Sequence, residues 1–404
     1  MLKRIKVIDL RVGMHIHEFC GSWMEHPFWR ENFLLKDPAD QQRIAQSGIT
    51  EVWIDVGKGL DIDAGESEAE INAAVEDVLE EAAAAPEVHP ERPLAEEVQR
   101  AARICEKARD AVVSMFQEVR MGNAMNAESA YRVVEEISAS VMRNPGALIS
   151  LARLKAADDY TYMHSVAVCA LMIALARQLG LDPAATREAG VAGLLHDLGK
   201  AFTPIDVLNK PGKLTDEEFS VVRQHPVTGH RALLDSKSVG DIPLDVCLHH
   251  HEKVNGTGYP HGLKDERISL FAKMGAVCDV YDAITSNRPY KSGWHPADAV
   301  RKMAEWSSGH FDGRVFQAFV KTIGIYPVGA LVRLSSGRLG VVVEQSEPSL
   351  LAPVVRVFFS TKANAYVQPE LVDLSQPGCR EKIAGHEQAA KWGIKHADRF
   401  WIGG

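Results

Sequence analysis

Residues 191–200 read VAGLLHDLGK, and this stretch carries the most specific signal for the fold. The apolar run Val191–Leu195 leads directly into His196 and Asp197, and Lys200 follows three residues later. A carboxylate that ends an apolar helical run is expected to be paired, protonated or bound to a cation, because an unpaired buried charge is costly. The stretch therefore predicts a buried polar centre within a helical domain.

Histidine is concentrated around this stretch. Seven of the sixteen histidines lie between positions 164 and 251, about twice an even share: His164, His196, His225, His230, His249, His250 and His251. A lone histidine on a helix is usually a core or surface residue, and His230 and His249 are interpreted in that way. Asp279 lies in the apolar helical run FAKMGAVCDVYDAIT, three residues before Asp282 on the same helix face. Imidazoles bind first-row transition metals and carboxylates bridge two ions, so the set favours a metal site.

The chain divides into four parts by composition and periodicity. Residues 1–64 contain the β-type runs IKVID and TEVWIDV and predict a small α/β or mainly β module. Residues 65–97 are rich in Asp, Glu, Ala and Pro and predict a solvated acidic linker, in part helical. Residues 98–325 predict an all-α domain. Residues 326–404 predict a β-rich extension with a hairpin that turns at residues 335–337.

Helical periodicity begins before the central domain and continues through it. It predicts helical structure over Leu94–Val141 and then a series of shorter helices, at about 159–179, 183–198, 215–236, 243–251, 266–285, 296–307 and 312–323.

Composition excludes several classes of protein. A chain of 404 residues that is 46% hydrophobic and 25% charged has enough apolar residues for more than one folded core. The formal charge of −9 argues against DNA or RNA as a partner. The longest uncharged apolar run, Ser165–Ala176, is too short to span a bilayer, and MLKRIKVIDL lacks a signal-peptide core, so a cytoplasmic protein without membrane contact is expected. Six scattered cysteines form no CxxC pair, which argues against a disulfide framework or a zinc ribbon.

The order of the polar motifs resembles that of the HD-GYP phosphodiesterases, which are HD-domain metal hydrolases associated with cyclic di-GMP. The motifs, in chain order, are His164, His196-Asp197-Leu198-Gly199-Lys200, His225, His250-His251-Glu252, Gly258-Tyr259-Pro260 and Asp279. The resemblance covers about residues 155–325. The first module, with GMHIHEF, SWMEHPF and VWIDVGKGLD, resembles a small domain of unknown function that often precedes HD-GYP domains.

The resemblance implies a centre of two metal ions. One ion would be held by His164, His196, Asp197 and Asp279, and the second by His225, His250 and His251, with Asp197 bridging the two. Some members hold a third ion through a Glu one turn before the first His, but Tyr160 lies four residues before His164, so two ions are expected here. The family uses iron or manganese most often, and nickel, cobalt or zinc would also suit these ligands. Glu252 and Asp282 are expected to orient imidazoles or the loop that carries Arg288.

The resemblance also implies the substrate contacts. Lys200, Arg288 and Lys291 would face the phosphates of cyclic di-GMP. Without the motif order, Arg288 and Lys291 would be interpreted as ordinary loop charges. Tyr259 is expected to contact the substrate. Its loop, KVNGTGYPHG, is equally compatible with a structured surface loop that makes no substrate contact. The resemblance to the family also implies that this loop could bind a protein partner.

These observations predict a metal-dependent phosphodiesterase that hydrolyses cyclic di-GMP to linear pGpG, with GMP as a further product and with Asp197 and Lys200 as catalytic residues. Two alternatives stay open: an HD hydrolase acting on another cyclic dinucleotide or phosphoester, and a non-catalytic cyclic di-GMP sensor. A sensor should have lost metal ligands, whereas every expected ligand is present. The N-terminal module is expected to regulate the site or to support a homodimer through the helices near 94–141.

Overall fold

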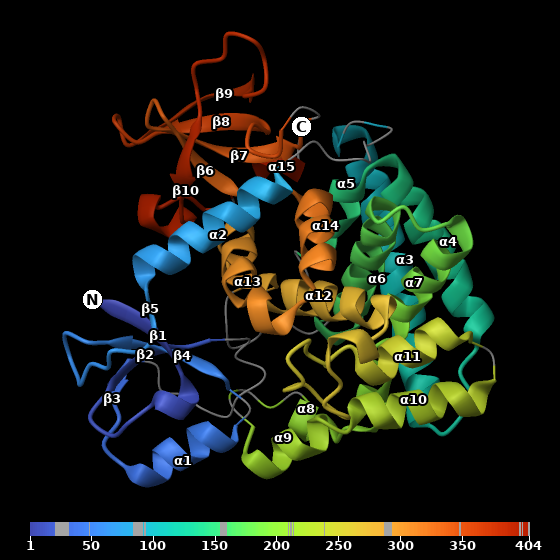
Figure 1. Cartoon of the computed structure of the whole chain (residues 1–404). Coiled ribbons are helices and arrows are strands. Elements are labelled where there is room, and N and C mark those ends of the chain that lie inside the picture. The colour runs from blue at the N-terminus through green and yellow to red at the C-terminus, as the bar shows by residue number, and fades with distance from the viewer. Residues whose placement is uncertain are drawn as a thin grey trace.

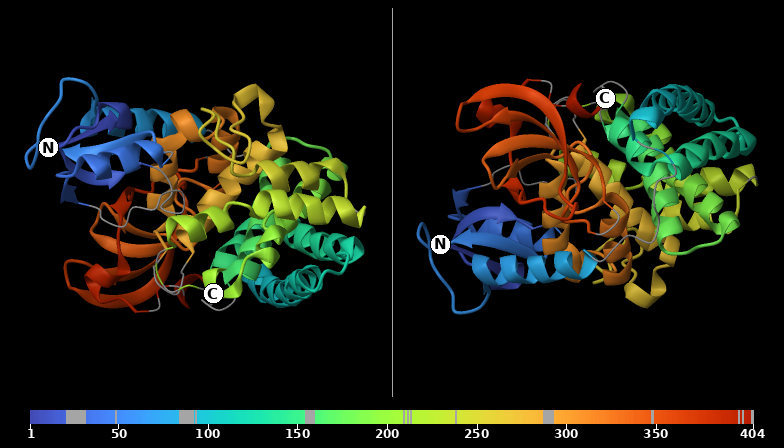
Figure 2. Two further views of the ribbon diagram at one scale, coloured as in Figure 1. Left: turned by 90° about the horizontal axis from the view of Figure 1, so that it is seen from below. Right: turned by 90° about the horizontal axis from the view of Figure 1, so that it is seen from above.

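The structure is a computed structural model that describes residues 1–20, 32–47, 49–83, 92, 94–153, 160–208, 210, 212, 214–237, 239–286, 293–346, 349–395, 397 and 399–402. These residues form a helical body with one antiparallel sheet near each end of the chain (Figure 1). In both views of Figure 2 the two sheets lie on the same side of the helical body. The predicted fold class, an all-α centre between two smaller β-containing parts, is confirmed.

The N-terminal part is a five-stranded antiparallel sheet with the strand order β3-β2-β4-β1-β5. Its strands are β1 (Leu2–Lys6), β2 (His15–Phe19), β3 (Phe33–Leu34), β4 (Glu51–Asp55) and β5 (Glu66–Ser67), with a 3-10 turn at Val7–Asp9. Helix α1 (Pro38–Gln46) begins after Asp37, whose side chain accepts a hydrogen bond from the Ala39 amide at 2.8 Å, as helix-capping aspartates do. Buried aliphatic residues from β1, β2 and β4, with Ile44 of α1, form the core of this part.

The acidic segment predicted to be a solvated linker is a packed helix over much of its length. Helix α2 (Glu68–Ala82) begins with a capping box formed by Ser67 and Glu70. Its apolar residues are spaced to lie on one face, and they are buried against α13 and α14: Ile71, Val75, Leu79 and Ala82. The expectation of a solvated segment was wrong because these few residues form one apolar stripe within an acidic composition. Residues 84–91 and 93, also assigned to the linker, lie outside the described part.

The described helices of the central body are α3 (Leu94–Arg120), α4 (Ala127–Arg143), α5 (Pro145–Arg153), α6 (Tyr160–Gln178), α7 (Pro183–Leu195), α8 (Ile205–Leu208), α9 (Asp216–Val222), α10 (His225–Ser236), α11 (Asp241–His249), α12 (Leu270–Thr285), α13 (Pro296–His310) and α14 (Gly313–Ile323), with 3-10 turns η4 (Leu198–Phe202) and η5 (Asp265–Arg267). The segment predicted as one helix over 215–236 is two helices, α9 and α10, and Pro226 lies in the first turn of α10, where its missing N–H has no cost.

Helix α6 is the centre of this body. It contacts α3, α4, α5, α7, α12 and α14, and it is buried on all sides between Met163 and Ala176. The longest apolar run of the sequence therefore lies inside the protein core, as a helix without a polar face must. None of the described helices combines the length and apolar character that crossing a lipid bilayer requires.

The C-terminal part is a second five-stranded antiparallel sheet, with the order β10-β6-β7-β8-β9. Its elements are β6 (Leu331–Leu334), β7 (Arg338–Glu344), β8 (Val354–Ser360), β9 (Ala365–Asp373), β10 (Ile383–His386), η6 (Ala389–Trp392) and α15 (Arg399–Ile402). The predicted hairpin is confirmed: β6 and β7 are joined through Gly337, whose φ of +85° is easily adopted only by glycine. One face of this sheet shares a buried apolar cluster with α3, α4 and α6.

Helix α13 joins the N-terminal sheet to the helical body. The indole Nε1 of Trp53 donates to Glu305 Oε1 at 2.6 Å, and a guanidinium nitrogen of Arg4 donates to the backbone carbonyl of Glu305 at 3.0 Å. Lys302 Nζ donates to Glu18 Oε2 at 2.9 Å. Helix α13 is thus attached to β1, β2 and β4 by both its side chains and its backbone.

Candidate metal centre

The seven predicted ligands come from five helical segments and meet inside the helical body. His164 lies on α6, His196 and Asp197 follow α7, His225 begins α10, His250 and His251 follow α11, and Asp279 lies on α12. All are buried except His251, which is half-buried. Among the described residues, three groups of side chains have the spacing of metal ligands: His225, His250 and His251; His164, His196 and Asp279; and His196, Asp197 and His250.

Close packing at two glycines positions the His196-Asp197 turn. A Cβ on Gly193 would lie 2.9 Å from the Cα of Cys169, so α7 and α6 approach more closely than a side chain allows. A Cβ on Gly199 would overlap the carbonyl oxygen of His225 and lie 2.6 Å from the Gly229 amide nitrogen. Since both neighbours are backbone atoms, glycine at 199 is what lets η4 lie against the start of α10.

The first group of ligands surrounds His164. Its Nε2 lies 2.9 Å from Asp279 Oδ1, 3.3 Å from His196 Nε2 and 3.5 Å from Asp197 Oδ2. The predicted members of the first metal site are therefore in mutual contact.

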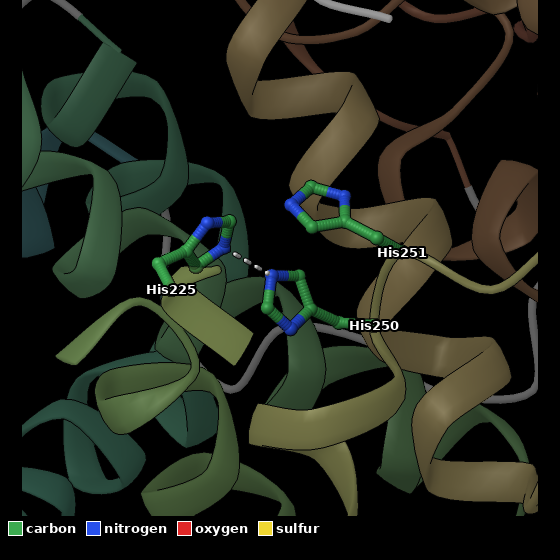
Figure 3. A group of neighbouring side chains, drawn as sticks. All are labelled: His225, His250 and His251. Atoms are coloured by element: carbon green, nitrogen blue, oxygen red, sulfur yellow. Dashed lines mark hydrogen bonds between the residues drawn. The ribbon is translucent and has the colours of Figure 1, made fainter. Parts of the chain in front are cut away.

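The second group contains three imidazoles that point toward one another (Figure 3). The Nε2 atoms of His225 and His250 are 3.3 Å apart, and the ring centroids of His250 and His251 are 4.1 Å apart. Asp197 Oδ1 lies 3.2 Å from His225 Nε2, while its other oxygen, Oδ2, lies 3.4 Å from His196 Nε2. Asp197 therefore presents one carboxylate oxygen to each group, as a bridging ligand must.

Hydrogen bonds at the opposite ring nitrogen orient these imidazoles. Nδ1 of His196 donates to the carbonyl of Gly193 at 2.8 Å, and Nδ1 of His225 donates to that of Val222 at 2.7 Å. A carbonyl can only accept, so Nδ1 of each ring carries a proton, and Nε2 is the nitrogen left for a metal ion. This is the orientation found in histidines that bind metals through Nε2.

The remaining imidazoles of the second group are neutral. Burial, and next the charge of His196, lower the pKa of His250 to about 3. Burial, and next His250, hold the pKa of His251 well below its usual value. Both side chains are thus in the protonation state that binds a metal ion.

Two carboxylate oxygens show that the residues present fit a cation. Asp197 Oδ1 and Asp279 Oδ2 are fully buried, and neither accepts a hydrogen bond from any residue in the described part. Burial raises the pKa of Asp197, but Lys200 and His196 outweigh it and hold that pKa well below its usual range. Burial likewise raises the pKa of Asp279, but the neighbouring imidazoles of His164, His251 and His196 together outweigh it and hold that pKa well below its usual range. Ionised carboxylates with unshared buried oxygens are suited to metal ions.

Lys200 and Tyr259 lie at the edge of this centre, and their predicted contacts with the substrate stay predictions. The Lys200 ammonium forms an ion pair with Asp197 Oδ2, and its side chain is 20% exposed. The Tyr259 ring stacks on the His251 ring with the centroids 4.6 Å apart. Gly258 is required for this contact because a Cβ there would lie 2.5 Å from the Cα of Glu252.

Two residues have a role that sequence reasoning missed or placed differently. The Arg223 guanidinium lies over the Tyr259 ring, 4.4 Å from its centroid, and no spacing in the sequence indicated that contact. Glu252 was expected to orient an imidazole or the Arg288 loop. Instead it accepts hydrogen bonds from the backbone amides of His261 and Leu263, at 2.7 and 2.8 Å, because the chain turns back over the end of α11.

Asp282, in contrast, contacts an imidazole as expected, since its Oδ2 lies 2.6 Å from His164 Nδ1. The predicted phosphate-binding residues Arg288 and Lys291 lie outside the described residues, so their roles stay predictions.

Most of the chain matches two domain families. Residues 2–130 match a domain of unknown function (DUF3391), and residues 137–315 match the HD domain. Over 410 aligned residues the chain is 57% identical to the cyclic di-GMP phosphodiesterase PA4108 of Pseudomonas aeruginosa, covering 100% of this chain and 96% of that protein.

Shorter similarities cover the central domain. A cyclic di-GMP phosphodiesterase of Vibrio cholerae is 39% identical over 189 residues, which are 43% of this chain and 38% of that protein. The 3'3'-cGAMP-specific phosphodiesterase 1 of the same organism is 34% identical over 167 residues, or 41% of this chain and 38% of that protein. With a similarity to the Pseudomonas protein along its whole length and an HD domain that contains the His/Asp centre, the chain belongs to the HD-GYP family of cyclic di-GMP phosphodiesterases.

Proposed function

We propose that this chain hydrolyses one phosphodiester bond of cyclic di-GMP in a metal-dependent reaction that gives linear pGpG. The observation that carries the proposal is Asp197, whose two oxygens face two separate groups of imidazoles at 3.2 and 3.4 Å. The similarity to PA4108 over the full chain supplies the substrate class.

Two divalent ions suit the two groups of ligands. His164, His196 and Asp279 would hold one, His225, His250 and His251 the other, and Asp197 would contact both. Bound ions supply a Lewis acid for the phosphoryl oxygens and a nucleophile from water at neutral pH. Iron or manganese is the proposed metal, with nickel, cobalt and zinc as alternatives that imidazole and carboxylate ligands also accept.

The side chains at the edge of the centre have their own tasks. The Lys200 ammonium adds a positive charge beside Asp197, where the charge that develops on a phosphoryl oxygen would be stabilised. Tyr259 offers an aromatic face next to His251 for contact with the substrate. Arg288 and Lys291 are proposed as further phosphate-binding residues, because guanidinium and ammonium groups are the usual partners of phosphate.

The test is a product analysis. Protein loaded anaerobically with Fe²⁺ or Mn²⁺ is incubated with cyclic di-GMP, and the nucleotides are separated by chromatography. We expect linear pGpG from the unmodified protein, and we expect Asp197→Ala to lose turnover and bound metal together. Asp298→Ala is a matched control, since Asp298 pairs with His386 away from the centre at 2.7 Å. Absence of a linear product with iron, manganese, nickel and cobalt alike would contradict the proposal.

A second substrate is favoured by a specific observation. A relative that is 34% identical over 167 residues is named as specific for 3'3'-cGAMP. Both cyclic dinucleotides should therefore be offered side by side, and the ratio of their kcat/KM values measured. A ratio in favour of the hybrid dinucleotide would assign the chain to that substrate. Binding of either without turnover in fully metallated protein would instead identify a sensor.

Other features of the expected activity stay predictions. These are further cleavage of pGpG to GMP, a homodimer formed through α3 and α4, a protein partner bound at the loop around Tyr259, and a cytoplasmic location.

A further inference from the structure

A second pair of histidines lies outside the seven ligands. His249 is the last residue of α11, and His261 lies in the loop that follows Tyr259. His249 Nε2 and His261 Nδ1 are 3.1 Å apart, with His249 partly buried and His261 exposed. The sequence alone made His249 an ordinary core or surface residue, and the centre described above uses neither side chain.

A carboxylate fixes the orientation of His249. Its Nδ1 lies 2.7 Å from Asp245 Oδ1, one helical turn earlier, and the hydroxyl of Ser269 donates to the other oxygen of Asp245. Because an ionised carboxylate only accepts, Nδ1 carries the proton and Nε2 presents its lone pair to His261. A carboxylate that holds the far nitrogen of an imidazole in this way is the arrangement common around metal-binding histidines.

The backbone holds His261 equally well. Its amide and that of Leu263 both donate to the buried carboxylate of Glu252, at 2.7 and 2.8 Å. The loop that carries His261 is therefore held near the end of α11, close to His249, by hydrogen bonds that do not depend on a metal ion.

The separation of the two nitrogens suits a shared ion. Two imidazole ligands on a tetrahedral zinc ion, each at about 2.0–2.1 Å, have their nitrogens about 3.3 Å apart. Within the dinuclear centre the corresponding separations are 3.3 Å for His164 and His196 and 3.3 Å for His225 and His250. The distance of 3.1 Å between His249 Nε2 and His261 Nδ1 is close to these values.

We propose that His249 and His261 form an additional site for a late first-row divalent cation, with Zn²⁺ as the best fit, and that Asp245 positions His249 for it. Imidazole nitrogens select this class of metal over Mg²⁺ or Ca²⁺. Because His261 is exposed, an ion can reach the pair from solvent. A cation there joins the end of α11 to the loop that places Tyr259 against His251.

Zinc stoichiometry tests the site. Protein that carries its resident metals is dialysed against micromolar ZnCl₂, and zinc, iron and manganese are counted by mass spectrometry. We expect the unmodified protein to gain one equivalent of zinc that both His261→Ala and His249→Gln lack, with resident metal unchanged. Asp245→Asn should keep the site with about 10- to 100-fold weaker zinc binding, since it removes only the orienting carboxylate.

His386→Ala is the matched control, because His386 is also a partly exposed imidazole held by a carboxylate, Asp298, at 2.7 Å. It should bind as much zinc as the unmodified protein. His261 is an exposed loop residue, so its alanine variant folds normally, and circular dichroism verifies this. Equal zinc binding by His261→Ala and the unmodified protein would overturn the proposal and leave a simple hydrogen bond between two histidines. Loss of resident metal from His261→Ala would also overturn it, because the pair would then belong to the dinuclear centre.

Discussion

Asp282 Oδ2 lies 2.6 Å from His164 Nδ1, one turn along α12 from Asp279, which contacts the other nitrogen of the same ring at 2.9 Å. His164 is thus held between two carboxylates of one helix. We expect Asp282→Asn to weaken metal binding about 10- to 100-fold, because the amide no longer fixes the ring and its tautomer. Competition with a coloured chelator measures the affinity.

The control for this variant is Asp298→Asn. Asp298 also contacts an imidazole, that of His386, but on α13 and outside the centre. If both variants bound metal as tightly as the unmodified protein, Asp282 would have no role in positioning His164.

Lys200→Ala should lower kcat/KM by about 10²- to 10³-fold, the usual cost of removing one group that stabilises charge in a transition state. Metal content should not fall, since the substitution removes a cation that pairs with the ligand Asp197. Steady-state kinetics and metal analysis on the same sample separate these effects. Lys210→Ala, which removes an ion pair with Glu218 at 2.6 Å, should leave both unchanged. Loss of metal from Lys200→Ala would reassign Lys200 to a structural role.

Arg223→Ala should raise KM about 2- to 5-fold with little change in kcat. The guanidinium lies over the Tyr259 ring, and a cation–π contact at an exposed site contributes about 0.5–1 kcal/mol. Arg223→Lys should recover part of the effect. The matched control is Arg187→Ala, which removes a similar contact at 4.6 Å between α7 and Tyr131 of α4. An unchanged KM in Arg223→Ala would show that Tyr259 needs no support from Arg223.

Gly199→Ala should lower the free energy of unfolding by about 1–3 kcal/mol, the usual cost of inserting a methyl group into a packed interior. The methyl would overlap the carbonyl of His225, so η4 and α10 must separate. Metal affinity should fall with stability, because Asp197 immediately precedes η4 and His225 begins α10. Gly313→Ala is the control, since a Cβ at the start of α14 meets nothing within 4 Å. Denaturant titrations measure the stability of both variants. Equal unfolding midpoints for Gly199→Ala and the unmodified protein would show that the backbone adjusts without cost.

The stability contributed by His386 should depend on pH. The hydrogen bond to Asp298 raises the pKa of His386 in the folded protein, against the effect of burial. Folding therefore favours the protonated ring, so this contribution is full below the unfolded pKa of about 6.5 and is lost as the pH rises through the folded pKa. Arg301 lowers and Glu387 raises the same pKa by smaller amounts.

For a pair this exposed, the contribution is about 0.5 kcal/mol or less. His386→Gln should unfold at a lower temperature than the unmodified protein at pH 6 and at the same temperature at pH 9. A difference that grows with pH would have the wrong sign for this pair.

The sequence indicated the buried polar cluster through its carboxylates, while the choice of the seven candidate ligands came from the resemblance to the HD-GYP family. Asp197 and Asp279 interrupt buried helical runs, and an ion is the natural compensation. The arrangement of the side chains in two groups, with Asp197 between them, could be seen only in the structure. It depends on how α6, α7, α10, α11 and α12 pack against one another.

The errors and omissions have physical reasons. Composition suggested that residues 65–97 are solvated, although four residues of α2 form a buried stripe. Arg223 was missed because its partner, Tyr259, is distant in sequence and the contact depends on the turn after α11. Glu252 bonds to backbone amides, which no side-chain pattern can indicate.

The C-terminal half of helix α13 has two sets of hydrogen-bond partners. On one side its Glu305 holds Trp53 and Arg4 of the N-terminal sheet, and at its last turn the carbonyls of Gly309 and His310 accept from the amides of Asn255 and Val254, just before Tyr259. A shortened chain that starts at Leu94 would remove the N-terminal sheet and α2 from α13 and expose the apolar surface that they cover. It is therefore not a suitable control protein for measuring the activity of the helical body alone. The N-terminal sheet and the helical body share this helix, so separating their contributions calls for point substitutions in α13 rather than deletion.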